Sequence, residues 1–115
     1  MHSLNGRAVL ITGASSGIGA ACAYAFAALD ARLLLAARRG DRLEQLAAAI
    51  YARHGVEVRT LALDVRDQPA VEAAINGLPT AWAVIDILVN NAGLSRGLDK
   101  LHEGKLARGV LRVPA

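Results

Sequence analysis

The chain has 115 residues, 54% of them apolar and 20% charged, so it is long enough for one small domain and too apolar for a disordered polymer. Its net charge of +3 arises entirely from residues 96–115, which contain five basic and two acidic side chains. The longest apolar run has ten residues, about half of the roughly 20 that cross a bilayer, and no leader-like segment is present. Together with the single cysteine, Cys22, and histidines at no zinc-binding spacing, this predicts a cytoplasmic protein with no membrane segment, disulfide or metal site.

Four short aliphatic runs are typical of strands buried in a parallel sheet. They cover residues 7–12, 32–37, 57–63 and 86–89. Each run is followed within a few residues by turn-forming or capping residues, which predicts short connections.

The segments between these runs have helical spacing. In residues 17–29 an apolar stripe is predicted, formed by Ile18, Ala21, Cys22, Ala25, Phe26 and Leu29. A second helix should reach about residue 54 and end at Gly55, and a third should be capped by Asp67, with Pro69 in its first turn. Their inward-facing residues are predicted to be Leu43, Leu46, Ala47 and Ile50, and Val71, Ala74, Ile75 and Leu78.

The alternation of strands and helices predicts an α/β fold, a parallel sheet with right-handed crossovers and helices on both faces. Beyond Gly93 the periodicity ends, and residues 94–115 contain three glycines, a proline and irregularly spaced leucines. We therefore predict a domain over residues 1–93 and an irregular basic tail over residues 94–115.

A glycine-rich turn, Thr12-Gly13-Ala14-Ser15-Ser16-Gly17-Ile18-Gly19, separates the first strand from the first helix. Glycines there permit a tight turn and let the backbone approach a diphosphate, which the amides and dipole of the helix N-terminus attract. The same glycines could serve turn geometry alone, and the spacing G-x-x-x-G-x-G differs from the G-x-G-x-x-G fingerprint.

Two other motifs could account for this turn. Residues 13–17 match G-x-S-x-G, the nucleophile elbow of serine hydrolases, but only 12 residues precede them and no suitable histidine follows. A P-loop needs a lysine after the second glycine, and none is present. Both alternatives are therefore disfavoured.

Arg38 and Arg39 follow the second strand, where a dinucleotide site selects its cofactor. A carboxylate there binds the ribose hydroxyls of NAD, whereas arginine binds the 2′-phosphate of NADP. The next carboxylate, Asp41, fits better in the cap or first turn of the second helix. The pair predicts NADP, and the alternative is that both arginines are solvated loop charges.

With this turn, Asp64-Val65 after the third strand and Asn90-Asn91-Ala92-Gly93 after the fourth, the chain resembles the short-chain dehydrogenase/reductase family over residues 7 to about 103. Ala37-Arg38-Arg39 and residues 91–94 resemble the NADP-dependent 3-hydroxy acid, or serine-type, dehydrogenases within it. The resemblance implies a Rossmann-type doubly wound parallel sheet, here truncated to about four strands in the order 3-2-1-4. It also implies hydride transfer between NADP(H) and a hydroxy or carbonyl substrate.

The resemblance assigns a role to each matching residue. The turn would cradle the diphosphate and adenine ribose, and the two arginines would hold the 2′-phosphate. Asp64 would accept a hydrogen bond from the adenine amine. Asn90-Asn91-Ala92-Gly93 would line the cofactor and tie the fourth strand to its neighbour. The implied cofactor-binding residues are Gly13, Ser15, Ser16, Gly17, Ile18, Gly19, Arg38, Arg39, Asp64, Val65, Asn91, Ala92 and Gly93.

The family's catalytic serine and Tyr-x-x-x-Lys lie in the second half of its domain. Here Tyr24 is followed four residues later by Ala28, and Tyr51 by Gly55. We therefore predict no catalytic residue, no turnover by this chain alone, and action on a small hydroxy or carbonyl substrate only within a full-length family domain. The fourth strand would also present an open edge, through which the chain could self-associate.

Two alternatives to the cofactor-binding half of an NADP-dependent oxidoreductase remain. One is a catalytically inert nucleotide-binding module, and the other a non-functional fragment of a disrupted gene. Nucleic acid is not expected as a partner, because the charge is only +3 and residues 96–115 contain no aromatic side chain to stack on bases.

Overall fold

One parallel sheet and three α-helices make up the part of the chain that the structure describes. The structure is a computed structural model, and it describes residues 3–82, 84–91 and 106–114. In chain order the elements are β1 (Ala8–Thr12), α1 (Gly17–Ala27), β2 (Arg32–Ala37), α2 (Gly40–His54), β3 (Val58–Ala62), α3 (Gln68–Asn76), the 3-10 helix η1 (Thr80–Trp82), β4 (Ile85–Asn90) and β5 (Leu106–Pro114). The strands lie in the order β3-β2-β1-β4-β5, and each neighbouring pair is parallel.

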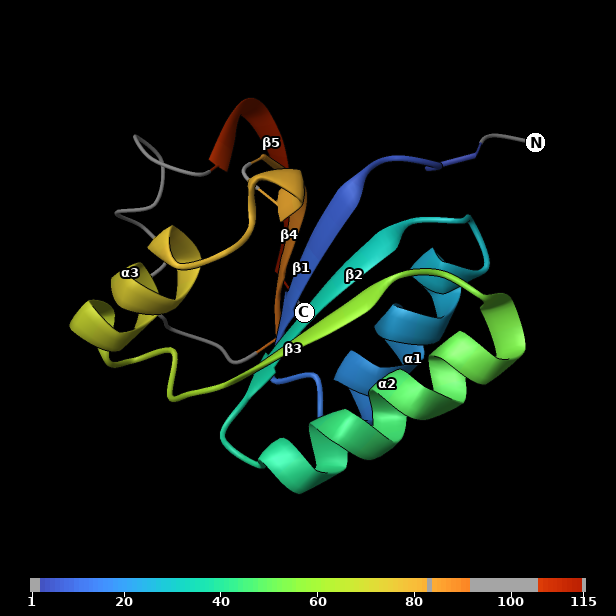
Figure 1. Ribbon diagram of the computed structural model, residues 1–115, viewed down its shortest axis with the longest axis horizontal. Helices are drawn as coiled ribbons and strands as arrows, with labels where there is room; N and C mark the ends of the chain where they lie inside the picture. Colours follow the sequence, from blue (N-terminus) through green and yellow to red (C-terminus); the bar gives the residue numbers. More distant parts are fainter. Residues whose placement is uncertain (1–2, 83, 92–105, 115) are drawn as a thin grey trace.

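Helices cover both faces of the sheet, with α1 and α2 on one face and α3 on the other (Figure 1). Successive side chains of a strand point to opposite faces, so each strand contributes to two cores. Val9 and Ile11 pack in the core beneath α1 and α2, whereas Ala8 and Leu10 pack in the core beneath α3. The predicted α/β class and the Rossmann-type order 3-2-1-4 are confirmed.

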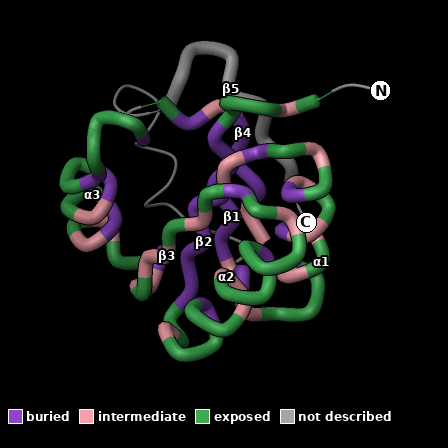
Figure 2. The backbone as a smooth tube through the Cα atoms, turned by 45° about the vertical axis from the view of Figure 1, so that its right-hand side comes forward, coloured by how far each residue is buried: buried purple, intermediate pink, exposed green. Residues whose placement is uncertain are grey.

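The two central strands are the most deeply buried segments. All of β1 and the last five residues of β2 are buried, which Figure 2 shows as continuous purple tube. Burying a leucine or isoleucine contributes roughly 1.5–3 kcal/mol, so the aliphatic runs that predicted these strands also stabilise the sheet. At the edge, β3 is only partly buried.

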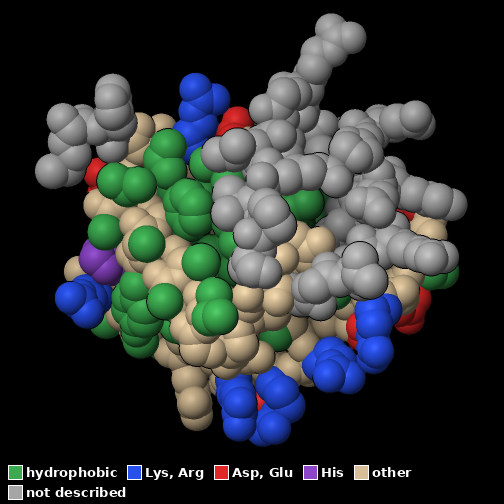
Figure 3. Space-filling model, turned by 180° about the vertical axis from the view of Figure 1, so that it is seen from behind, with side chains coloured by type: hydrophobic (Ala, Val, Ile, Leu, Met, Phe, Trp, Pro, Cys, Tyr) green, Lys and Arg blue, Asp and Glu red, His purple; other side chains and the backbone are tan. Residues whose placement is uncertain are grey.

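The buried face of α1 overlaps only partly with the predicted stripe: Cys22 and Phe26 are half-buried and pack against the core, but none of the fully buried residues belongs to the stripe. Its buried residues are small and four apart, namely Gly19, Ala23 and Ala27. Ile18, which began the predicted stripe, is 64% exposed. No charged residue occurs in residues 17–29, so periodicity could not identify the inward face, and close packing on the sheet selects the smallest side chains. Seen from behind, apolar side chains accordingly gather on the side of the molecule where α1 lies (Figure 3).

The predicted ends of α2 and α3 are confirmed. Gly55 follows α2 with φ 69°, a left-handed conformation that glycine adopts without strain. The Asp67 side chain caps α3 by accepting from the Ala70 amide at 3.2 Å, and Pro69 lies in the first turn. Of the residues predicted to face inward, Leu43, Ile50, Val71, Ile75 and Leu78 are buried, and Leu46, Ala47 and Ala74 are half-buried.

A fifth strand corrects two predictions. Leu106–Pro114 form β5, which pairs with β4 from Ile85↔Leu106 to Asn90↔Pro114, with a shift in register between Ile85 and Ile87. The irregular segment predicted for residues 94–115 is therefore wrong for Leu106–Pro114, and the fourth-strand edge is not open. Unpaired backbone groups of an edge strand favour a further strand whatever the local periodicity, so the sequence pattern did not reveal this pairing.

None of the helices in the described ranges has the length and apolar character that crossing a bilayer requires.

Candidate functional site

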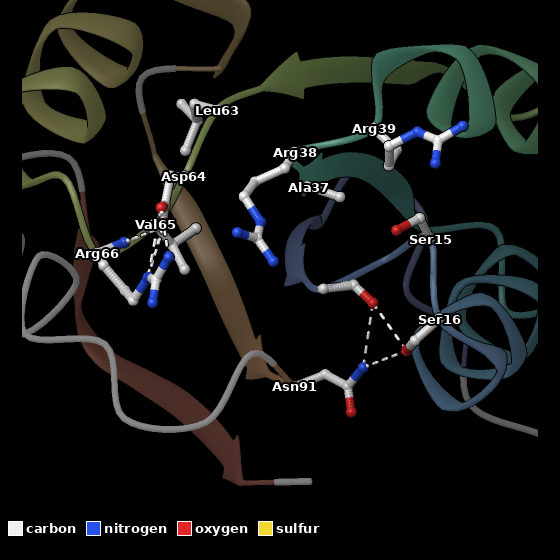
Figure 4. A pocket seen from close by; sticks show the side chains of 11 residues that line it. Ser15, Ser16, Ala37, Arg38, Arg39, Leu63, Asp64, Val65, Arg66 and Asn91 are labelled. Carbon is white, nitrogen blue, oxygen red and sulfur yellow. Dashed lines mark hydrogen bonds and ion pairs between the residues drawn. The ribbon is translucent and has the colours of Figure 1, made fainter.

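A cavity of about 360 Å³ opens at the carboxyl ends of the strands (Figure 4). In parallel α/β sheets this end carries the loops between strands and helices, and ligands bind in the crevice that they form. The residues that line it are Gly13, Ser15, Ser16, Ala37, Arg38, Arg39, Leu63, Asp64, Val65, Arg66 and Asn91. They come from the last residue of β2 and from the segments that follow β1, β2, β3 and β4, which the fold brings to one edge.

The glycine turn between β1 and α1 forms one wall. Gly13 has φ 60°, which places it in the left-handed region that glycine tolerates. Ser16 caps α1: its hydroxyl accepts from the Gly19 amide at 3.2 Å and donates to the Gly13 carbonyl at 2.9 Å. The first amides of a helix lack partners within it and lie at the positive end of its dipole, so this wall suits an anion.

Two glycines of the turn have different surroundings. A Cβ on Gly19 would lie 2.3 Å from the Gly13 carbonyl oxygen and 3.0 Å from the Asn91 amide nitrogen, so only glycine fits. A Cβ on Gly17 would meet no protein atom within 4 Å. Gly19 is therefore required for packing, whereas the space beside Gly17 is open to a ligand.

Asn91 joins the end of β4 to the glycine turn. Its Nδ2 donates to the Gly13 carbonyl at 3.1 Å and lies 2.7 Å from the Ser16 hydroxyl (Figure 4). One residue earlier, the Thr12 hydroxyl donates to Asn90 Oδ1 at 3.0 Å. Neighbouring strands β1 and β4 are thus linked at the cavity by side chains as well as by the sheet. Ala92 and Gly93, which the resemblance also assigned to the site, lie outside the described residues.

The two arginines after β2 both line the cavity but differ in their partners. Arg39 pairs with Asp41, Nη2 to Oδ2 at 3.0 Å, and this guanidinium lowers the pKa of the Asp41 carboxyl. Arg38 points into the cavity and forms no hydrogen bond or ion pair with another described residue (Figure 4). Asp41 lies in the first turn of α2, as predicted. Because Asp41 pairs with Arg39 and not with Arg38, Arg38 is the arginine more available to a ligand.

Asp64 and Arg66 form a tight pair on the opposite wall. Arg66 Nη2 lies 2.9 Å from Oδ2 and Nε lies 3.1 Å from Oδ1, and the Arg66 amide also donates to Oδ1 at 2.9 Å. The Arg66 guanidinium, assisted by that amide, lowers the pKa of Asp64 from 3.8 to about 2. The carboxylate is therefore ionised, and accepts only, across the physiological range.

The cavity brings together eight of the residues named from the sequence. They are Gly13, Ser15, Ser16, Arg38, Arg39, Asp64, Val65 and Asn91. Gly17, Ile18 and Gly19 belong to the same turn but are not among its lining residues. Sequence reasoning missed Ala37, Leu63 and Arg66; the basic residue two positions after Asp64 was a signal for the last. No group of three or more His, Cys, Asp or Glu side chains that could hold a metal ion occurs within the described ranges.

Comparisons with known proteins identify relatives over most of the chain. Residues 7–112 match the sequence model of the short chain dehydrogenase family. An NADP-dependent 3-hydroxy acid dehydrogenase of Schizosaccharomyces pombe is 44% identical over 98% of this chain and 44% of its own length. A probable NADP-dependent dehydrogenase of Dichelobacter nodosus is 43% identical over 86% of this chain and 90% of its own length.

A solved structure shares the fold. The L-sorbose reductase of Gluconobacter frateurii, crystallised with NADPH and L-sorbose, superposes with a TM-score of 0.74 and 40% identity over 80% of this chain. That overlap covers 35% of the reductase. The chain therefore spans less than half the length of this reductase and of the S. pombe enzyme.

Proposed function

The chain belongs to the short-chain dehydrogenase family, and from that premise we propose that its cavity binds NADP(H) and that the chain is the cofactor-binding half of an NADP-dependent oxidoreductase. The observation that carries the proposal is Arg38, a guanidinium that points into the cavity without a hydrogen bond or ion pair to any described residue. A guanidinium whose donors form no hydrogen bond with a described residue at this position suits the 2′-phosphate that distinguishes NADP from NAD. Relatives named as NADP-dependent support the same choice.

Each wall of the cavity fits one part of the dinucleotide. The N-terminus of α1 and the open space beside Gly17 suit the diphosphate, because amides and dipole favour negative charge there. Arg38, with Arg39 beside it, suits the 2′-phosphate. Asp64 and Val65 suit the adenine ring, since a carboxylate accepts the hydrogen bond that the adenine amine donates. We assign Asn91 to holding the turn in place for the ligand.

When bound, NADPH would donate a hydride to a carbonyl substrate and NADP⁺ would accept one from a hydroxy substrate, which is the chemistry of the family. The 115 residues contain no Tyr-x-x-x-Lys, so the proposal for this chain stops at binding the cofactor. Turnover requires an acid–base group at the substrate oxygen, and the chain offers none of the family type. Action on a small hydroxy or carbonyl substrate within a longer family domain, and a cytoplasmic location, stay predictions.

Calorimetric titration of the 115-residue chain with NADPH and with NADH tests the proposal. We expect saturable binding with NADPH preferred by about 10- to 100-fold, because a hydrogen bond to a charged group contributes about 1.5–3 kcal/mol. A folded chain that binds neither dinucleotide, or both equally, would contradict it.

An inert nucleotide-binding module is the second candidate, favoured by the lack of Tyr-x-x-x-Lys. Neither candidate predicts hydride transfer by the purified chain, so turnover would contradict both. Translation of the genomic DNA just downstream in all frames separates them: a Tyr-x-x-x-Lys there would identify the cofactor-binding half of an enzyme, and its absence would favour the module.

A further inference from the structure

The Asp64–Arg66 pair is more than a surface ion pair, because it forms part of the cavity wall. Both residues line the cavity, and Asp64 retains 35% side-chain exposure there. The guanidinium meets the carboxylate edge to edge through Nε and Nη2, and the Arg66 amide adds a third donor. Two parallel hydrogen bonds fix the plane of the carboxylate, which a single contact would not do.

The donors occupy most of the accepting capacity of Asp64. A carboxylate has about four lone-pair positions. Oδ1 accepts from the Arg66 amide at 2.9 Å and from Nε at 3.1 Å, whereas Oδ2 accepts from Nη2 at 2.9 Å and has a longer contact of 3.3 Å with the same Nε. Because Nε has one hydrogen, which it shares between the two oxygens with the shorter distance to Oδ1, Oδ2 has capacity for one external donor, in a direction that Arg66 determines.

The pair also removes an electrostatic conflict. An isolated carboxylate in the cavity would repel a ligand that carries several phosphates. Arg66 neutralises Asp64, and Arg39 is neutralised by Asp41 in the same way, so the net charge of the lining groups comes from Arg38. Asp64 can then contact a polar, uncharged part of an anionic ligand at little cost.

We propose that Arg66 is a positioning residue for base recognition, which holds Asp64 as an acceptor aimed at the amino group of adenine and so selects adenine over hypoxanthine. The inference rests on the proposed function, since it assumes that the dinucleotide occupies this cavity. Adenine carries a donating amine where hypoxanthine carries a carbonyl oxygen that only accepts. A fixed carboxylate attracts the first and repels the second, whereas a freely rotating one could turn away from either.

The test compares NADPH with its hypoxanthine analogue by calorimetry, for the wild-type chain and Arg66→Gln. We expect the wild type to prefer NADPH by about tenfold, the size of one modest charge-assisted hydrogen bond, and Arg66→Gln to lose most of that ratio. Arg59→Gln is the matched control: it removes the same charge from an exposed position that does not line the cavity, and it should keep the ratio.

Arg66→Lys separates positioning from charge. Lysine keeps the positive charge but cannot form the two parallel hydrogen bonds, so we expect it to retain much of the NADPH affinity and still lose part of the adenine preference. Equal weakening of both ligands in Arg66→Gln and Arg66→Lys, with the ratio intact, would overturn the inference and leave Arg66 as a simple charge. If Arg66→Gln does not fold, the ratio in Arg66→Lys decides.

The outcomes distinguish this inference from the proposed function. A wild-type chain that binds NADPH but does not discriminate against the hypoxanthine analogue refutes base selection alone. A folded wild-type chain that binds neither ligand refutes the proposed function, and the inference with it.

Discussion

The arginines at the two ends of β2 differ in whether they contact other residues of the protein. Arg32, the first residue of the strand, donates from Nη1 to the Ala81 carbonyl at 2.6 Å, lies 4.7 Å from the centre of the Trp82 ring and pairs with Glu57 at 3.8 Å. Arg38, directly after the strand, has no hydrogen bond or ion pair with another described residue and points into the cavity. An arginine with three protein partners stabilises the fold, whereas one without them is available to a ligand.

The same difference holds for the two ends of the sheet. A cavity of about 460 Å³ also opens at the amino end, but its charged lining residues are paired within the protein: Asp86 accepts from the Ala8 amide at 2.9 Å and pairs with Arg7 at 3.3 Å. At the carboxyl end, the glycine turn leaves open space beside Gly17 and a cavity in front of Arg38. The following changes test this division, from the largest expected effect to the smallest.

Gly19→Ala should have the largest effect because it damages both the fold and the carboxyl end. The added Cβ would lie 2.3 Å from a backbone oxygen, so we expect a loss of stability at the upper end of about 1–3 kcal/mol and loss of NADPH binding. Thermal unfolding and calorimetry measure the two effects. Gly17→Ala, with no protein atom within 4 Å of the new Cβ, is the control: it should keep its stability while weakening NADPH binding. A stable Gly19→Ala would show that the close approach is not required.

Arg38→Gln should affect binding and leave stability unchanged. Loss of a charge-assisted hydrogen bond to the 2′-phosphate predicts about 10- to 100-fold weaker NADPH binding, with NADH binding unaffected. Calorimetry with both dinucleotides, beside a thermal melt, measures this. If the melting temperature falls instead, Arg38 has a structural role like that of Arg32.

Arg32→Gln should lower stability and leave cofactor binding unchanged, the opposite of what we expect for Arg38→Gln. The variant loses the hydrogen bond to Ala81 and the contact with the Trp82 ring, for which we expect about 1–2 kcal/mol lower stability. Urea denaturation measures the change, and the preference for NADPH over NADH should be that of the wild type. A changed preference would mean that the two ends of the sheet are coupled.

Acid should release the Asp64–Arg66 pair with a small effect. The pKa of Asp64 lies at about 2 in the folded chain, below its ordinary value of 3.8, so its contribution to stability is complete above pH 3.8 and disappears as the pH falls toward 2. The stability difference between wild type and Asp64→Asn should therefore shrink over that interval. An NMR titration of the Asp64 carboxyl with a midpoint near 3.8 would show that the pair does not persist in solution.

Much of the fold followed from local patterns. The aliphatic runs predicted β1 to β4 to within one residue at each end, Gly55 predicted the end of α2 and Asp67 the start of α3. These features can be predicted from the sequence because burial, a positive φ and side-chain capping each require particular residue types at particular positions. The glycine turn and Arg38 could also be identified from the sequence, and residues of the turn and Arg38 line the cavity.

The ion pairs of the charged residues around the cavity could not be predicted from the sequence. The prediction for Asp64 named the adenine amine and did not include the ion pair with Arg66, and the prediction for Arg38 and Arg39 did not include the ion pair of Arg39 with Asp41. A pairing two residues away depends on which rotamers bring the side chains together, and the order of residue types does not specify rotamers.

By itself, the sequence determined the alternation of strands and helices, the buried character of β1 and β2, and the residue types around the turn. Only the tertiary structure decided that α1 buries Gly19, Ala23 and Ala27 rather than the stripe through Ile18, and that Leu106–Pro114 pair with β4. Both decisions depend on contacts between segments distant along the chain. An all-apolar helix can bury any face until a sheet selects the smallest one, and an edge strand pairs through backbone groups that every residue except proline carries in full.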